Sequence, residues 1–200
     1  SFGLLLGIIY GATSASRVVL FPSFEPELIA AASKKNPPTF VPGVPPMYDR
    51  LARSADDLGI DLSQARYAMS GAMTLTDATV HRWEAVAGGR LTEGYGLTEA
   101  SPFCCVNPFS TSRKIGTIGL PAPSTTAKVV DPDDPTREVE LGEPGELLIH
   151  GPQVFRGYWQ NEEETAKTLL PGGWLRTGDL VTQDEDGFIT IVDRKKEIII

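Results

Sequence analysis

The feature that most constrains the fold is an alternation of short β-type runs and helical runs through the first half of the chain. Apolar β-type segments are separated by segments whose apolar residues recur at helical spacing, with Pro or Gly near the joints. Because strand–helix–strand units close through right-handed crossovers, the alternation predicts a parallel sheet with helices packed on it. The predicted strands are 17–21, 39–41, 66–69 and 90–92, and the predicted helices are 26–35, a helix opened by Pro45-Pro46, and 76–89.

The pattern changes after residue 113. Short β-type runs at 127–131, 145–151 and 188–193 are separated by turns rich in Pro, Gly and Asp. One helix is expected among them, with Asn161 as its N-cap and glutamates in its first turn. The sequence therefore predicts an α/β fold with a parallel-sheet βα subdomain over residues 1–113 and a β-rich subdomain from residue 114.

Charge and cysteine usage exclude several classes of function. The chain has 18 Lys and Arg against 26 Asp and Glu, a net charge of −8, and its longest basic cluster is Arg194-Lys195-Lys196. A nucleic-acid-binding surface is therefore not expected. Cys104 and Cys105 are neighbours, a spacing that suits neither a disulfide framework nor a zinc site, so we expect two small buried residues in a reducing setting.

The apolar opening, residues 1–16, lacks the basic start of a signal peptide and is shorter than the ~20 residues that span a bilayer. We expect it to form a core helix. The chain begins and ends in the middle of a pattern, so we expect it to be an internal piece of a longer protein.

A glycine-rich segment, EGYGLTE at residues 93–99, follows the strand predicted at 90–92. Ligands of open α/β sheets bind beyond the carboxyl ends of the strands, where this segment is expected to form a loop. Gly94 and Gly96 would let the backbone approach a ligand, and Tyr95 offers a flat face to a heteroaromatic ring. The segment is thus a candidate binding loop, with an ordinary turn as the alternative.

Thr98 and Glu99 add a hydroxyl and a carboxylate to this candidate loop. A carboxylate close to a polyphosphate is repelled unless the two share a cation, and Mg²⁺ commonly uses one or two protein carboxylates together with phosphate oxygens. The pair therefore favours a nucleotide with its metal ion.

Two further segments strengthen the nucleotide interpretation. Asp179 follows a Thr-Gly pair in WLRTGDL, and a carboxylate can accept two hydrogen bonds from a ribose diol. Asp193 and Arg194 form a charged pair where the last predicted strand ends. Each of these features has an ordinary alternative when it is taken singly. Asp179 could be a turn residue, and Asp193 and Arg194 could form an ion pair on the surface.

These segments together resemble the adenylate-forming superfamily of acyl-CoA synthetases, luciferases and peptide-synthetase adenylation domains. The resemblance covers essentially the whole chain. Leu97 favours the acyl-CoA ligases within the superfamily, and FVPGVPPMYDRLA (40–52) resembles the long-chain fatty-acid ligases. The motifs that carry the resemblance are AMSGAM (68–73), YGLTEASP (95–102), GELLIHGPQVFRGYW (145–159), GWLRTGDL (173–180) and DRKKEI (193–198).

The resemblance implies a role for each candidate site residue. Tyr95 would stack on adenine, with Gly71, Ala72 and the Gly94–Gly96 backbone around the base. Thr98 would touch phosphate, and Glu99 would hold Mg²⁺; these two are the implied catalytic residues. Asp179 would bind the ribose hydroxyls with assistance from Arg194.

The resemblance also implies the fold and the reaction. The chain would be a fragment of the large N-terminal domain of an adenylating enzyme, with a distorted barrel-like β-rich subdomain over 114–192 and a hinge at 193–200 that starts the C-terminal domain. A fatty carboxylate would attack ATP, pyrophosphate would leave, and coenzyme A would convert the acyl-AMP to acyl-CoA with release of AMP. The fragment itself is expected to be inactive, because the pyrophosphate loop and the C-terminal catalytic Lys of the family are not found in it.

Two other functions stay open on the sequence. The acyl-AMP could be loaded onto a carrier protein instead of coenzyme A, or the chain could be a module that binds an adenylate without turnover. Apart from that carrier protein, the expected partners are small molecules (fatty acid, ATP and coenzyme A), without nucleic acid. The expected location is the cytoplasm, with peripheral membrane contact possible but not indicated.

Overall fold

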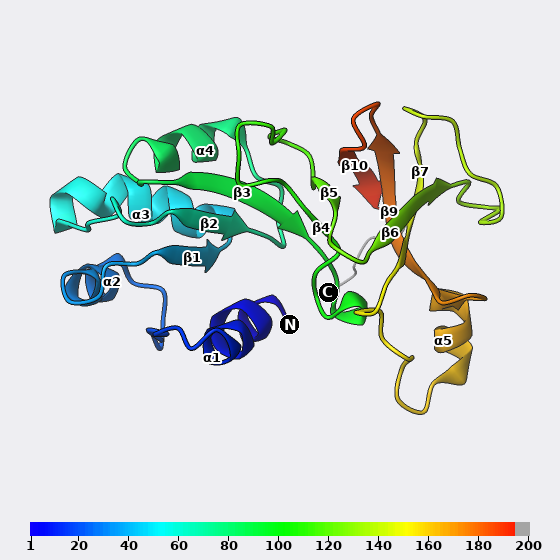
Figure 1. Cartoon of the computed structure of the whole chain (residues 1–200), viewed down its shortest axis with the longest axis horizontal. Coiled ribbons are helices and arrows are strands. Elements are labelled where there is room, and N and C mark those ends of the chain that lie inside the picture. The colour runs from blue at the N-terminus through cyan, green and yellow to red at the C-terminus, as the bar shows by residue number, and fades with distance from the viewer. Residues whose placement is uncertain (195–200) are drawn as a thin grey trace. The chain divides into compact units, whose positions relative to one another are not determined.

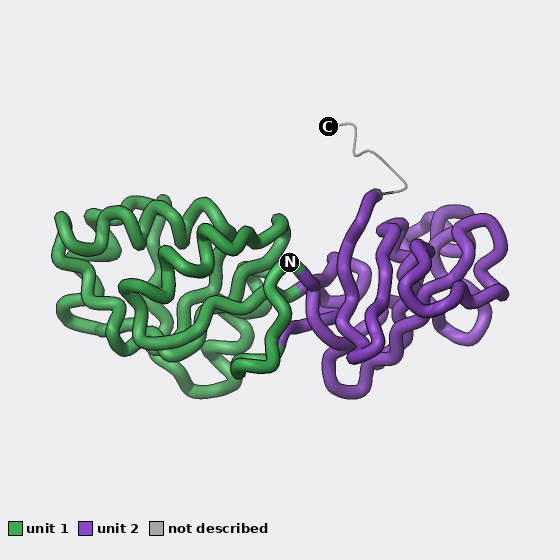
Figure 2. Tube along the Cα trace, turned by 90° about the horizontal axis from the view of Figure 1, so that it is seen from above, with its two compact units in different colours: residues 1–94, 108–116 green, residues 95–107, 117–200 purple. Residues whose placement is uncertain are grey.

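The computed structural model describes residues 1–194, which divide into two compact units (Figure 2). Unit 1 comprises Ser1–Gly94 and Pro108–Gly116, and unit 2 comprises Tyr95–Asn107 and Thr117–Ile200. Unit 1 is α/β and unit 2 is β-rich, which confirms the predicted fold class. The division differs from the predicted boundary after residue 113 because 95–107 group with unit 2. The predicted hinge, 193–200, lies outside the described residues from position 195 onward.

Unit 1 is built on parallel strands joined by helices, as the alternating pattern predicts (Figure 1). Strand β2 lies between β1 and β3, and the register aligns Phe40, Tyr67 and Arg90 at the start of the three strands. Pro45 and Pro46 begin α3, and Thr76 caps α4 by accepting the Thr79 amide at 3.3 Å. The elements are α2 (Pro26–Ser33), β1 (Phe40–Gly43), α3 (Pro45–Leu58), β2 (Tyr67–Ser70), α4 (Asp77–Glu84) and β3 (Arg90–Tyr95).

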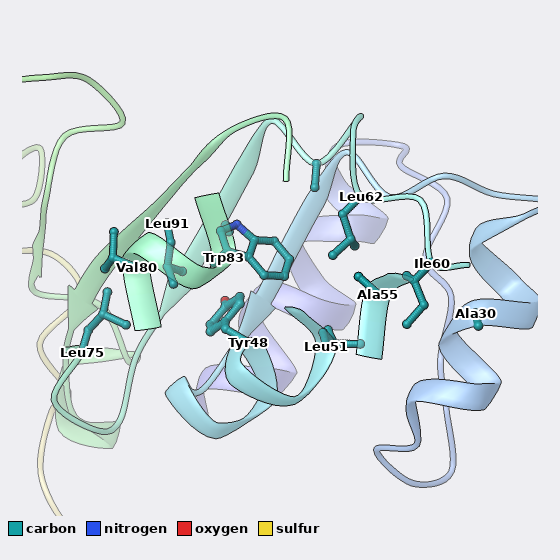
Figure 3. Packing of buried hydrophobic residues seen from close by; sticks show 12 residues of the cluster. Ala30, Tyr48, Leu51, Ala55, Ile60, Leu62, Leu75, Val80, Trp83 and Leu91 are labelled. Carbon is teal, nitrogen blue, oxygen red and sulfur yellow. The ribbon is translucent and has the colours of Figure 1, made fainter. Parts of the chain in front are cut away.

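The core of unit 1 centres on two aromatic side chains, Tyr48 of α3 and Trp83 of α4 (Figure 3). Both are fully buried, and their rings meet edge to face with centroids 5.0 Å apart. The Tyr48 hydroxyl donates to the carbonyls of Val41 at 2.9 Å and Met69 at 2.7 Å. One side chain thus packs the helix layer and also ties α3 to the strands β1 and β2.

Unit 2 is an antiparallel sheet with the strand order β10-β9-β7-β6, and β8 pairs with β9. Its core includes Leu147, Ile149 and Leu175, together with both cysteines, which are buried as predicted. Asn161 caps α5 by accepting the Glu164 amide at 3.1 Å, as predicted. The elements are η2 (Thr98–Ala100), β4 (Cys105–Val106), β5 (Leu120–Pro121), β6 (Thr126–Val130), β7 (Gly145–His150), α5 (Glu162–Thr168), β8 (Leu169–Leu170), β9 (Trp174–Gln183) and β10 (Ile189–Arg194).

The strand predicted at 17–21 is wrong. These residues form neither a helix nor a strand and pair with no strand in the described structure, and all are exposed, Leu20 by 69%. A β-type apolar run becomes a strand only where another strand offers its edge. The described chain places none beside 17–21.

The opening of the chain is helical, but its prediction as a core helix is wrong. It forms a π-helical segment, η1 (Leu4–Ile9), followed by α1 (Tyr10–Thr13), and Gly11 is the one buried residue in this pair. Periodicity and composition predict helix formation, whereas burial requires a covering element. Among the described residues, no helix combines the length and the apolar character needed to cross a bilayer.

Candidate functional site

The glycine-rich segment begins as a strand instead of a loop. Strand β3 continues to Tyr95, so the predicted loop at 93–99 starts only at Gly96. Chain reversal at Gly96 is tight, because a Cβ placed there would lie 1.5 Å from the carbonyl oxygen of Pro102. The returning chain donates the Cys104 amide to the Tyr95 carbonyl at 2.9 Å. This hydrogen bond fixes the backbone of Tyr95 at the start of the turn.

Tyr95 contacts Asp179 directly, although the two are 84 positions apart in the sequence. The Tyr95 hydroxyl donates to Asp179 Oδ2 at 2.5 Å, and Asp179 is only 2% exposed. Burial raises the pKa of Tyr95 well above its ordinary value, and the negative charge of Asp179 raises it further. The phenol therefore keeps its proton and can donate to Asp179 throughout the neutral range.

Asp179 lies within strand β9 and not in a turn, the alternative role left open on the sequence. Gly178, immediately before it, has φ +75, a left-handed conformation that favours glycine. The β9–β10 register pairs Asp179 with Arg194 and pairs Leu180 with Asp193. The backbone thus brings the two segments singled out in the sequence side by side, while the Arg194 side chain lies outside the described structure.

Glu99 is held by a tyrosine that the sequence interpretation did not select. The Tyr158 hydroxyl donates to Glu99 Oε1 at 2.7 Å, and the Phe155 amide donates to the Glu99 carbonyl at 2.7 Å. The rings of Phe155 and Tyr158 pack edge to face at 4.9 Å. Tyr158 belongs to the motif GELLIHGPQVFRGYW, so the motif located the segment but not the contact. Thr98 precedes Glu99 in η2 and is exposed.

Gly71, Ala72 and Gly94 lie in unit 1, and the other candidate residues lie in unit 2. Gly71 follows β2 and donates its amide to the Gly43 carbonyl at 3.2 Å. A Cβ on Gly71 would lie 3.3 Å from the Gly94 carbonyl oxygen, so these two glycines are neighbours. Ala72 has φ +66, an unusual conformation for a residue with a side chain. The structure thus brings the 71–72 turn against β3.

Glu93 is a second residue that the sequence interpretation missed. Its register partner is Ser70, at the carboxyl end of β2. Glu93 is 8% exposed, and burial raises the pKa of its carboxyl to about 7 against a lowering by the Leu75 amide. Its Oε2 and the Ser70 hydroxyl are both buried without a hydrogen-bond partner. No sequence motif marks Glu93, so this buried acid beside the 71–72 turn could be found only in the structure.

Glu99 offers one half-exposed carboxylate for a metal ion. Over residues 1–194, no group of three or more His, Cys, Asp or Glu side chains is placed to enclose a cation. A single carboxylate fits the chemistry of Mg²⁺, which takes most of its ligands from water and phosphate oxygens. It does not fit the closed ligand sets of structural zinc sites.

Curated sequences similar to this chain are named as ligases. The chain is 44% identical to a long-chain-fatty-acid–CoA ligase of Yersinia pestis over 164 residues, which are 82% of the chain and 29% of the relative. It is 40% identical to a long-chain-fatty-acid–CoA ligase of Bacillus subtilis over 200 residues, all of the chain and 35% of the relative. The chain therefore spans about a third of the length of such relatives.

Solved structures share the fold. ATP-bound MatB from Rhodopseudomonas palustris matches with a TM-score of 0.83 and 30% identity, over 99% of this chain and 39% of that one. A long-chain-fatty-acid-CoA ligase from Archaeoglobus fulgidus matches with a TM-score of 0.80 and 30% identity, over 93% and 40%. The family model described as AMP-binding enzyme matches residues 1–159. Because the family model covers about four-fifths of its residues and solved structures of similar sequence share its fold, this chain belongs to the AMP-binding enzyme family.

Proposed function

We propose that this chain forms the adenylate-binding portion of an ATP-dependent long-chain fatty-acid–CoA ligase. The reaction joins a fatty carboxylate to the α-phosphate of ATP with loss of pyrophosphate. The thiol of coenzyme A then attacks the acyl-adenylate, forming acyl-CoA and releasing AMP. Support comes from the family membership and from relatives named as ligases of this substrate class.

The contact between Tyr95 and Asp179 carries this proposal. It joins the end of β3 to β9, so a flat aromatic face and a carboxylate acceptor lie together. An adenosine needs both groups, one for the base and one for the ribose hydroxyls. Because Asp179 is buried beneath this contact, the nucleotide has to compete with or rearrange the Tyr95 hydrogen bond.

The remaining nucleotide contacts are assigned to backbone and flanking residues. The family resemblance assigns the backbone at Gly71, Ala72, Gly94 and Gly96 to the base, because small residues would permit close approach. Arg194 lies opposite Asp179 in the β9–β10 register and assists at the ribose.

Thr98 and Glu99 are assigned to the phosphates. Thr98 is exposed and would offer its hydroxyl to a phosphate, and the Glu99 carboxylate, which accepts from the Tyr158 hydroxyl, would hold Mg²⁺. When bound, Mg²⁺ offsets the negative charge of the phosphates. The protein's own contribution would be to hold the Glu99 carboxylate in place through the Tyr158 hydroxyl.

Fatty-acid-dependent exchange of pyrophosphate into ATP by the complete protein tests this function. Glu99→Gln should lower the Mg²⁺-dependent exchange by at least about a hundredfold, because the amide cannot supply the negative charge. Glu138→Gln is the matched control, since Glu138 is an exposed unit 2 glutamate paired with Lys128. Full exchange activity in Glu99→Gln would remove Glu99 from the metal role.

The acceptor is tested separately, with coenzyme A and a phosphopantetheinylated carrier protein compared side by side. The proposal expects acyl-CoA and AMP with coenzyme A. Acyl transfer to the carrier with indifference to coenzyme A would assign the protein to the alternative acyl-AMP ligases. Nucleotide binding without any exchange would indicate a non-catalytic module.

A further inference from the structure

The pairing of β7 with β9 is interrupted at the place where β9 carries Asp179. The register pairs Glu146 with Leu180 and Leu148 with Arg176. Between these pairs β7 has only Leu147, whereas β9 has Thr177-Gly178-Asp179. The surplus residues form a bulge, a device that redirects a side chain and leaves backbone groups outside the ladder.

Side chains accept hydrogen bonds from the backbone amides of this bulge. The Gly178 amide donates to Glu146 Oε1 at 3.3 Å, and the Asp179 amide donates to the Thr177 hydroxyl oxygen at 3.1 Å. The Thr177 hydroxyl in turn donates to the Leu147 carbonyl at 2.8 Å. The path of the chain into Asp179 is therefore set by Glu146 and Thr177.

Glu146 is itself held in one place. It is 2% exposed, and Arg176 Nε donates to its two carboxylate oxygens at 3.1 and 3.2 Å. The Arg176 guanidinium also contacts Glu146 through Nη2 and donates from the same atom to the Pro132 carbonyl at 3.1 Å. A carboxylate fixed from both oxygens gives Gly178 a rigid acceptor.

We infer that Glu146 and Thr177 are positioning residues for Asp179, acting through the bulge and not through contact with the nucleotide. A buried ion pair needed only for stability could be replaced by apolar side chains with little loss. Here the Glu146 carboxylate instead accepts a hydrogen bond from the amide of Gly178, the residue directly before Asp179. The position of Glu146 is thereby coupled to the position of the Asp179 side chain. The inference rests on the proposed function in taking Asp179 as the ribose acceptor.

The test measures how the complete protein discriminates between ATP and its 2′-deoxy and 3′-deoxy analogues in fatty-acid-dependent pyrophosphate exchange. Asp179→Asn defines the size of the ribose signal. Glu146→Gln should reduce the preference for ATP over the deoxy analogues by about tenfold, mainly through the KM of ATP, since a displaced carboxylate loses a charge-assisted hydrogen bond. Glu138→Gln should leave the preference unchanged.

Thr177 provides a second, independent pair of variants. Thr177→Val removes the hydroxyl at nearly constant shape and should also reduce the preference, whereas Thr177→Ser keeps the hydroxyl and should restore it. A purely structural role would lower activity with ATP and with its analogues equally. If Glu146→Gln does not fold, the Thr177 pair decides the inference.

The two possible failures are distinguishable. If Asp179→Asn leaves the preference for ATP unchanged, the ribose assignment in the proposed function is wrong, and the inference falls with it. If Asp179→Asn abolishes the preference while Glu146→Gln and Thr177→Val both retain it, the ribose assignment stands and only the positioning role is overturned.

Discussion

Tyr95 brings two chemical groups to the proposed site, and they can be separated by substitution. Tyr95→Phe keeps the ring and removes the hydrogen bond with which the ribose has to compete, so it should leave AMP binding unchanged or tighten it by up to about tenfold. Tyr95→Ala should weaken AMP binding by about tenfold or more, since stacking on a base contributes ~1–3 kcal/mol. Titration of the complete protein with a fluorescent AMP analogue measures both affinities. Equal affinities for Phe and Ala would show that the ring does not contact the base.

Glu93 should make the stability of the chain depend on pH. Burial raises the pKa of its carboxyl from 4.5 to about 7, so the folded chain binds the proton more tightly than the unfolded chain does. The stability that depends on the neutral Glu93 carboxyl is therefore fully present below pH 4.5, and it is lost as the pH rises from there to about 7. The loss is at most ~3 kcal/mol for a shift of this size.

Glu93→Gln removes this dependence, because its side chain is neutral at every pH while an amide oxygen remains to accept from Leu75. Urea denaturation should show the variant gaining stability over the parent at pH 8 and gaining little at pH 5. Glu27→Gln, an exposed change in the same unit, serves as the control. A gain of the same size at both pH values would mean that the Glu93 carboxyl is not neutral in the folded chain at low pH.

At the scale of elements, Arg113 joins the segment 108–116 to the rest of unit 1. Its side chain is 8% exposed and contacts Glu84 of α4 through two nitrogens, Nη2 at 2.9 Å, and the Leu91 carbonyl at 2.7 Å. Glu84 also accepts the Leu91 amide at 2.9 Å. One ion pair thus links a connecting segment, a helix and the strand that leads to Tyr95.

Arg113→Met should lower the free energy of unfolding by about 3 kcal/mol, because Glu84 keeps its charge without its partner. The double variant Glu84→Met with Arg113→Met should recover much of that loss, since it leaves no unpaired charge. Urea denaturation of the parent, the single variant and the double variant measures the coupling. Equal destabilisation by the single and double variants would show that hydrogen bonds to Leu91, not the ion pair, dominate.

The two elements that the sequence predicted wrongly have one physical cause. Residues 17–21 have β-type composition, yet all are exposed; residues 1–16 have helical, apolar composition, yet only Gly11 among them is buried. Local propensity measures what a segment prefers by itself, whereas pairing and burial depend on a neighbour that propensity does not supply. The runs at 40–43, 67–70 and 90–95 became strands because each has another to pair with.

At the scale of the whole molecule, each unit has a hydrophobic core of its own, while the chain spans about a third of the length of its curated relatives. We expect the 200-residue chain alone to release no pyrophosphate from ATP in the presence of fatty acid, whereas the complete protein does so. The groups for transferring the acyl chain are expected elsewhere in the complete protein. A pyrophosphate-release assay on both samples checks this, and robust turnover by the chain alone would show that its 200 residues suffice.

The sequence by itself determined the α/β class and most element types, and it predicted the residues of the candidate site, because periodicity, breakers and short motifs are local properties of a chain. Tyr95, Glu99 and Asp179 are recognisable in this way. Only the tertiary structure decided that Tyr95 meets Asp179, that Tyr158 holds Glu99 and that Glu146 supports the bulge beneath Asp179. Contacts of this kind depend on strand register and on the burial of polar atoms, which form between segments far apart in the chain and leave no periodic signal in either one.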